Sequence, residues 1–205
     1  MLRGTGFCLF VEMLSVIQDA HSKVAEVRLV IESRYWREDL ANYARAFRPL
    51  KKPPSWSERL AVNFEKDVTL SLFMVRRLAE AGKFSSRMSK HKVELYRSKF
   101  VGEHHRLRFG DVGELYRIDD EKRILKGVPF VCNQFIHADF TYAIQGSDRN
   151  WAGLFTSSDF EKRKWLYRVP LTEIVKVLEL AVSDYPSAIF TRYDREKEDW
   201  IVETD

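Results

Sequence analysis

Residues 55–82 read SWSERLAVNFEKDVTLSLFMVRRLAEAG. Apolar residues recur in this stretch at steps of three and four, and one stripe comprises Leu60, Phe64, Val68, Leu72, Val75 and Ala79. Such spacing is typical of an amphipathic helix that buries one face. Ser55 with Glu58 three residues later predicts a capping box at the start of the helix. Gly82 stands where a helix ends, so we expect one long helix that runs to about Ala81.

A second long helix is expected upstream, from about Leu14 to Phe47. Its apolar residues also fall at three- and four-residue steps, and no Gly or Pro lies between Ser15 and Arg48. One break near Ser33 is compatible with this pattern. The prolines in residues 49–54 end the helix. Because a short connector joins the two helices, we expect them to pack antiparallel.

The middle of the chain is less regular. Residues 91–99 alternate apolar and polar side chains, which favours a strand or an irregular segment over a helix. Glu114 to Phe140 is expected to be helical, although Gly127 and Pro129 lie within it. Proline is tolerated in the first turn of a helix, so a new or kinked helix is expected to begin near Pro129.

After Thr141 the pattern changes to short runs of aromatic and β-branched residues separated by turn clusters. Three strands are expected, at Tyr142–Ile144, Trp151–Thr156 and Lys164–Val169. Thr172 is expected to cap a helix of about three turns that Pro186 closes. A hairpin follows, formed by Ala188–Tyr193 and Asp199–Val202. The predicted fold class is therefore α+β: an antiparallel helical bundle at residues 1–140, followed by a small antiparallel sheet with one helix at 141–205, packed on the first region.

Composition narrows the class of protein. With 205 residues, 45% hydrophobic and 31% charged, the chain is typical of a globular protein. Cys8 and Cys132 are the only cysteines, and they match no disulfide framework or zinc spacing. The adjacent His104 and His105 would point in opposite directions on an extended chain and have no cysteine partner nearby, so neither a metal nor a cofactor is expected. The apolar run at residues 7–17 contains Glu12 and lacks a cleavage pattern, so we expect a cytoplasmic protein without a membrane span.

The charge is unevenly distributed. The net charge is +4, yet residues 83–108 contain eight Lys or Arg against two acids. Aromatic residues interleave with these cations, which is typical of surfaces that bind phosphates and unstacked bases. The candidate nucleic-acid-binding residues are Arg87, Lys90, Lys92, Arg97, Lys99, Arg106 and Arg108. The alternative interpretation is a solvated, charge-rich connector.

Asn133 and His137 lie four residues apart on a predicted helix, so their side chains share one face. An amide in that position can hydrogen-bond an imidazole and fix its tautomer, as a catalytic or binding histidine requires. The alternative is a buried pair whose members only satisfy each other.

Two long helices followed by a helix that ends in Cys132-Asn133-Gln134-Phe135-Ile136-His137 resemble the HEPN superfamily (higher eukaryote and prokaryote nucleotide-binding domain). That family's motif is Arg, a polar residue, three variable residues and His. The resemblance implies a metal-independent ribonuclease, dimeric through its helices, in a bacterial defence or toxin–antitoxin module. It also implies that Asn133 and His137 line the cleft, with His137 as general acid/base or phosphate contact.

Cys132 stands where the family has arginine, and a thiol cannot supply a permanent charge or forked donors to a phosphate. Another arginine close in space is the remaining source of that charge, and the candidates are Arg76, Arg77 and Arg123. Two functions follow as hypotheses. One is RNA or nucleotide binding, with weak or absent cleavage by Cys132, Asn133 and His137. The other is a non-enzymatic scaffold whose helices dock a protein partner.

Overall fold

The computed structural model describes residues 32–48, 55–102, 112–146, 150–196 and 198–205. The chain divides into two units, Met1–Glu32 and Ser33–Asp205, and the elements below belong to the second. Of the helix expected over residues 14–47, the second part is confirmed as α2, Ser33–Phe47. The first part lies outside the described residues.

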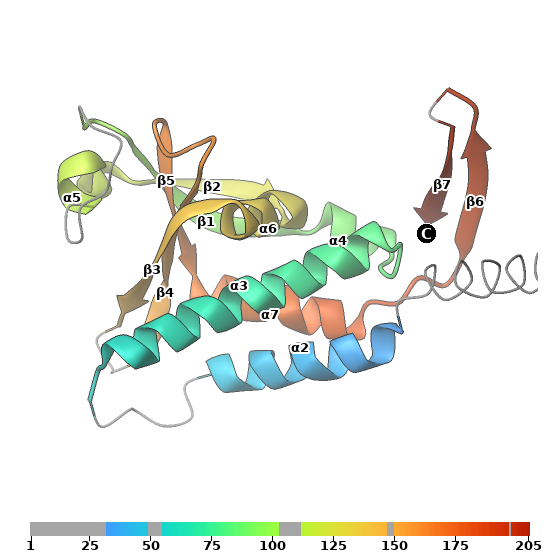
Figure 1. Ribbon diagram of the computed structural model, residues 1–205, viewed down its shortest axis with the longest axis horizontal. Coiled ribbons are helices and arrows are strands. Elements are labelled where there is room, and N and C mark those ends of the chain that lie inside the picture. Colours follow the sequence, from blue (N-terminus) through green and yellow to red (C-terminus); the bar gives the residue numbers. More distant parts are fainter. Residues whose placement is uncertain (1–31, 49–54, 103–111, 147–149, 197) are drawn as a thin grey trace, which may run out of the picture. The chain divides into compact units, whose positions relative to one another are not determined.

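The stretch 55–82 forms the long helix α3, Glu58–Glu80. Its cap is Ser57 rather than Ser55, because the Ser57 hydroxyl accepts a hydrogen bond from the Leu60 N–H at 3.2 Å. Gly82 follows the helix with φ +63°, a left-handed conformation that glycine adopts without steric cost. The expected antiparallel arrangement of α2 and α3 is confirmed (Figure 1).

Four shorter helical segments follow α3. They are α4 (Ser86–Lys90), α5 (Val112–Leu115), the 3₁₀ turn η1 (Ile118–Asp120) and α6 (Val128–Ile136). Helix α6 begins where Pro129 predicted a new helix, because proline occupies its first turn. The last helix, α7 (Leu171–Ser183), starts directly after Pro170 without a side-chain cap, so the expected cap at Thr172 is wrong.

The central element is a five-stranded antiparallel sheet with the order β2-β1-β5-β4-β3. Its strands are β1 (Lys92–Lys99), β2 (Lys122–Gly127), β3 (Ala138–Gln145), β4 (Trp151–Ser158) and β5 (Trp165–Pro170). The expected C-terminal hairpin is confirmed as β6 (Ile189–Asp194) paired with β7 (Asp199–Thr204). Strands β2 and β3 are the two edges of the large sheet, and α6 is the connection between them. Helix α6 therefore crosses the sheet.

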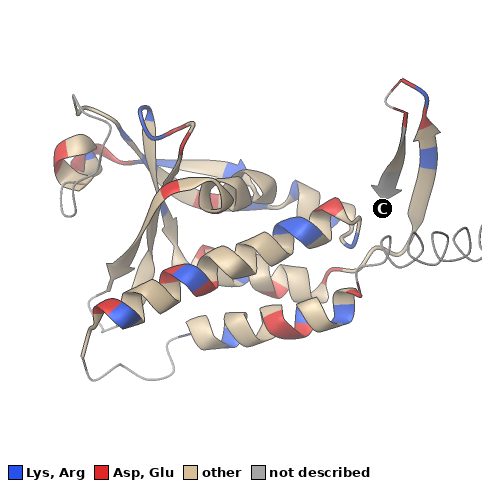
Figure 2. Ribbon diagram, in the orientation of Figure 1, with Lys and Arg blue, Asp and Glu red and all other residues tan. Residues whose placement is uncertain are grey.

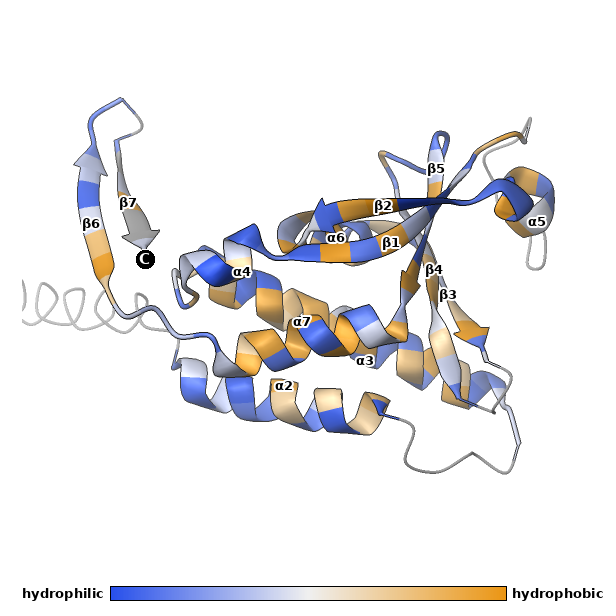
Figure 3. Cartoon of the chain, turned by 180° about the vertical axis from the view of Figure 1, so that it is seen from behind, coloured by the Kyte–Doolittle hydropathy of each residue, from blue (hydrophilic) through white to orange (hydrophobic). Residues whose placement is uncertain are grey.

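One face of the sheet is packed against helices. Val93, Leu95, Leu154 and Val169 point to this face and are at most 1% exposed. Helices α3, α6 and α7 cover it, and α2 packs on α7 and α3. Figure 3 shows hydrophobic and hydrophilic segments alternating along these helices, as expected when one side is buried. At the start of α3, the Phe64 ring stacks on Trp151 of β4 at 4.8 Å.

The predicted helical bundle followed by a small sheet is wrong. Strands β1 and β2 both come from residues 1–140, the region predicted to be a helical bundle, and they join β3, β4 and β5 in one sheet. The strand favoured at residues 91–99 is confirmed as β1. The residues from Glu114 to Phe140, expected as one helical region, form α5, η1, β2, α6 and the start of β3. The edge strand β2 contains no buried residue, so its alternation carries little hydrophobic signal. The fold is α+β, with strands from both sides of residue 140 in one sheet.

Candidate functional site

The motif residues lie on α6, which packs against α3. Asn133 is half-buried, and its Oδ1 accepts a hydrogen bond from Nη1 of Arg76 on α3 at 2.7 Å. His137 follows the last turn of α6, where its backbone N–H donates to the Asn133 carbonyl at 3.1 Å. The His137 side chain is exposed. The structure thus brings Asn133 to an arginine and places His137 at the surface.

Of the three arginines considered from the sequence, Arg76 is the one that reaches the motif. Its Nε also donates to Glu80 Oε1 at 2.7 Å, and Arg77 donates to the other oxygen of Glu80. The Arg76 hydrogen bond is the largest cause of the lowered pKa of the Glu80 carboxyl. Arg123 instead pairs with Glu94 on the sheet. Arg76 is therefore held between one carboxylate and one amide, as a polar contact between α3 and α6.

The Cys132 side chain is neither accessible to a ligand nor present as the reactive thiolate. It is fully buried, and burial raises the pKa of its thiol to about 12. The side chain lines a cavity of about 190 Å³ whose walls come mainly from α3, α4 and α6. Because only a thiolate is a good nucleophile or metal ligand, Cys132 is chemically inert at neutral pH.

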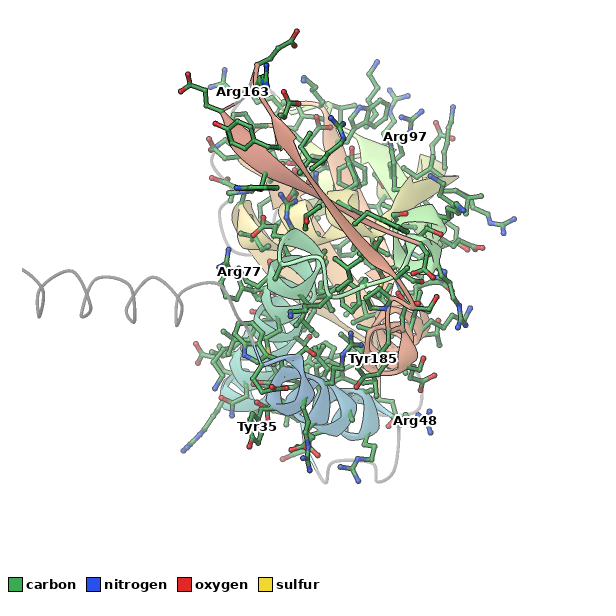
Figure 4. All side chains as sticks on the ribbon, turned by 90° about the vertical axis from the view of Figure 1, so that its right-hand side faces the viewer. Tyr35, Arg48, Arg77, Arg97, Arg163 and Tyr185 are labelled. Atoms are coloured by element: carbon green, nitrogen blue, oxygen red, sulfur yellow. The ribbon has the colours of Figure 1, made fainter. Side chains whose placement is uncertain are left out.

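The basic residues predicted to bind nucleic acid are spread over two elements. Arg87 and Lys90 lie on α4, and Lys92, Arg97 and Lys99 lie on β1. Arg106 and Arg108 lie outside the described residues, as do His104 and His105. Because neighbouring strand residues point to opposite faces, β1 does not present its three cations together. Arg97 stacks over the Trp165 ring at 4.2 Å. Figure 4 shows Arg97 on the sheet, well apart from Tyr185, which follows helix α7.

The sheet face opposite the helices carries a group that the sequence did not reveal. Strand pairing places one residue from each of the five strands side by side, in the order Arg123, Tyr96, Arg168, Phe155 and Tyr142. We call these five residues the open-face row. Residues directly opposite one another in antiparallel strands point to the same face. The row therefore combines three aromatic rings and two guanidinium groups on one surface.

Burial confirms that this surface faces away from the helices. Leu95, Leu154 and Tyr167 are next in sequence to members of the row, point to the other face and are at most 3% exposed. In contrast, Tyr142 is 45% exposed, and the Arg123 side chain is 66% exposed. The row spans five strands, or about 19 Å at the usual spacing between strands.

Within the row, charge and stacking are coupled. The Arg168 guanidinium lies 4.0 Å from the centre of the Tyr96 ring, and Glu121 binds it through two hydrogen bonds. The Glu121 bond is the largest cause of the raised pKa of Arg168. Glu94 accepts from Arg123 and from the Tyr96 hydroxyl. Each guanidinium is thus neutralised and held in place, so the row offers flat, rigid faces more than net charge.

Exposed lysines without an acidic partner in the described part of the chain occur on β1 and β2. They include Lys92 and Lys99 at the two ends of β1 and Lys122 at the start of β2, but Lys99 and Lys122 leave their strands on the same face as Arg97, opposite the row. Figure 2 shows cations along the paired strands of this sheet. Lys92 lies four residues before Tyr96 on β1, and side chains alternate along a strand, so Lys92 points to the same face as Tyr96. Of these three lysines, Lys92 is therefore the one that shares the face of the stacking groups.

One end of this face is closed. Tyr116, which precedes η1, is buried, and its hydroxyl donates to the Lys162 carbonyl at 2.6 Å. Its ring contacts Phe100 and Phe140. As a result Ser98 and Leu166, one step further along the same face, are at most 2% exposed. The open-face row is the boundary between this covered end and the accessible remainder of the sheet.

The residues that the structure describes contain no group of three or more His, Cys, Asp and Glu side chains that could hold a metal ion. None of their helices combines the length and hydrophobicity needed to cross a membrane. Comparisons of the chain with protein-family models, with curated proteins and with solved structures found no match.

Proposed function

We propose that the protein binds single-stranded RNA, with unpaired bases stacked on the open-face row. The observation that carries this proposal is the alignment of Tyr96, Phe155 and Tyr142 with two guanidinium groups on one accessible sheet face. Aromatic rings and guanidinium planes are the groups on which proteins stack unpaired bases. Because every base has a flat face, such a surface tolerates many sequences.

The attraction for the RNA phosphates comes from a residue outside the row. Arg123 and Arg168 are neutralised by Glu94 and Glu121, so they contribute stacking rather than net charge. The exposed Lys92, which shares the face of Tyr96 on β1, supplies charge that attracts the RNA backbone. RNA binding is therefore expected to weaken with salt, because a lysine that contacts the phosphates releases their counterions.

The proposal is binding rather than cleavage. Cleavage at the motif would need a side chain that can accept or donate a proton, next to a protein group that is free to bind the phosphate. The Cys132 thiol is buried and protonated, and the Asn133 amide oxygen is engaged by Arg76. His137 alone of the three motif residues is exposed. The motif helix also packs on the face of the sheet opposite the row, through Phe130 against Tyr167.

Replacing Tyr142 by alanine is expected to weaken RNA binding about tenfold, since stacking contributes roughly 1–3 kcal/mol per base. Tyr142 is 45% exposed, so the substitution removes a ring without opening the core. The measurement is fluorescence anisotropy with a labelled single-stranded RNA of about 12 nucleotides at about 50 mM salt.

The matched control is Phe160→Ala. Phe160 lies in the turn between β4 and β5 and is 80% exposed, so its loss is expected to leave both the affinity and the melting temperature unchanged. Equal losses in the two variants would point to non-specific apolar contacts instead of the row. If the native protein shows no RNA binding even at low salt, the function proposed here is wrong.

A further inference from the structure

The C-terminal hairpin exposes several large apolar side chains. Ile189 is 54% exposed, Phe190 64%, Tyr193 49% and Trp200 63%. Both faces of β6 are open, because the residues pointing to either side of the strand are exposed. A hairpin with one buried face would instead show an alternating pattern. The hairpin therefore lacks the layer that normally stabilises it.

The edges of the hairpin are open as well. Among the described strands, β6 pairs with β7 and with no other. A two-stranded hairpin alone is marginally stable in water, and three or more strands with an apolar face are needed. Soluble proteins protect such edges with charged side chains, above all lysine, with proline or with a bulge. Strand β6 reads IFTRYD, so it has Arg192 and Asp194 but no lysine or proline, and it pairs with β7 in an unbroken register.

We propose that β6 is a self-association surface, on which a second copy of this chain pairs its own β6 in antiparallel orientation. The two hairpins then form one four-stranded sheet around a twofold axis. An interface of this kind uses the same patch on both subunits, so the patch must be complementary to itself. The sequence of β6 can be tested for that property register by register.

A twofold axis perpendicular to the sheet places one residue opposite its own copy. With Thr191 on the axis, Ile189 lies opposite the partner's Tyr193, and this pair occurs twice. Tyr193 already makes an edge-to-face contact with Trp200 of β7, with ring centroids 5.5 Å apart. On one face of the new sheet, Trp200 and Tyr193 of one copy therefore lie in a row with the partner's Ile189, and the twofold axis repeats this row. Aromatic and β-branched residues opposite each other are favourable pairs in sheets.

The neighbouring registers are worse. With Arg192 on the axis, two guanidinium groups would lie directly opposite each other, and like charges in that position are unfavourable. With Phe190 on the axis, Tyr193 would extend beyond the first residue of the partner strand and lose its partner. The Thr191 register alone pairs the whole apolar length of β6. This self-complementarity is the reason to assign the surface to a second copy rather than to an unrelated protein.

Two substitutions test the surface and its register. Thr191→Lys brings two like charges together on the axis, and it is expected to weaken the dimer at least about tenfold in analytical ultracentrifugation. Thr172→Lys, at another exposed threonine on α7, is the matched control and is expected to leave the dimer unchanged. Circular dichroism melting checks that both variants fold.

The second substitution, Thr191→Cys in a Cys8→Ser background, is expected to give a disulfide-linked dimer under mild oxidation, since residues opposite each other have Cβ atoms close enough to bridge. Phe190→Cys in the same background is expected to stay uncrosslinked, because its opposite residue is the partner's Arg192. A native chain that stays monomeric to about 200 µM overturns the proposal, since 1 mM is already a very weak Kd. Cross-linking by Phe190→Cys but not by Thr191→Cys overturns the register.

Discussion

Replacing Tyr96 and Phe155 together by leucine is expected to weaken single-stranded RNA binding about 100-fold. Each ring is expected to stack one base, and stacking contributes roughly 1–3 kcal/mol per base. Leucine keeps most of the apolar volume, so the substitutions remove the flat faces while the sheet stays packed. Tyr96 also loses its contact with the Arg168 guanidinium, which lies 4.0 Å from the ring centre. Fluorescence anisotropy with a labelled RNA measures the affinity.

The control for this double variant is a second pair of exposed aromatic residues away from the sheet face. Tyr35 on α2 is 63% exposed and Phe160 is 80% exposed, and both can be replaced by leucine without touching the core. We expect that variant to bind RNA like the native protein. A loss of less than about threefold for Tyr96→Leu with Phe155→Leu, in a protein that still folds, would contradict base stacking on the row.

The largest expected effect on stability comes from Arg37. This arginine of α2 is only 2% exposed, and its guanidinium lies between the rings of Tyr185, at 3.9 Å, and Phe84, at 5.1 Å. It donates hydrogen bonds to the carbonyl oxygens of Ala181 and Lys83. One side chain thereby joins α2 to the end of α7 and to the segment after α3. Burial lowers the pKa of this guanidinium, and the nearby Tyr185 and Asp184 oppose that effect.

Arg37→Ala is expected to reduce the free energy of unfolding by about 3 kcal/mol. The substitution leaves a cavity and two unpaired carbonyl groups, and both reduce stability. Part of this loss is offset, because the folded protein no longer has to bury a charged group. The melting temperature should fall by about 8 °C, as followed by circular dichroism. Arg45→Ala, at an exposed arginine of the same helix, should change it by no more than about 2 °C. Equal effects of the two substitutions would show that the Arg37 contacts contribute nothing specific.

Local patterns predicted much of the secondary structure. The stripe of Phe64, Val68, Leu72 and Val75 became the buried face of α3, because helical periodicity reports burial directly. Strands β4 and β5 and the C-terminal hairpin also follow from aromatic and β-branched runs between turn residues. Helix α7 was expected between Thr172 and Pro186. These signals lie within a few residues of each other, so a single sequence contains them.

The architecture depends on pairings that no local pattern contains. Strand β1 pairs with β5 through Tyr96 and Arg168, which are far apart in the chain. Helix α6 looks like the continuation of a helical region because its sequence is apolar on most sides. It is instead the crossover that lets β2 and β3 occupy opposite edges. This is the physical reason why the predicted helical bundle at residues 1–140 was wrong.

The candidate sites likewise combine features that a local pattern predicted with features that depend on tertiary packing. The spacing correctly placed Asn133 on a helix, but His137 lies just beyond the end of α6, and Arg76 was one of three arginines considered as a partner. The depth of Cys132 depends on how α3, α4 and α6 pack, which spacing does not report. The open-face row was missed because its five residues come from five strands and meet only through the strand register.

The central claim, that unpaired bases stack on the open-face row, is tested most directly by photocrosslinking. The native protein is irradiated with a single-stranded RNA that contains 5-iodouridine, and the modified peptides are located by mass spectrometry. The proposal expects adducts on Tyr96, Phe155 or Tyr142, which the sheet register places side by side. Adducts confined to other exposed aromatic residues, such as Phe160, would contradict it.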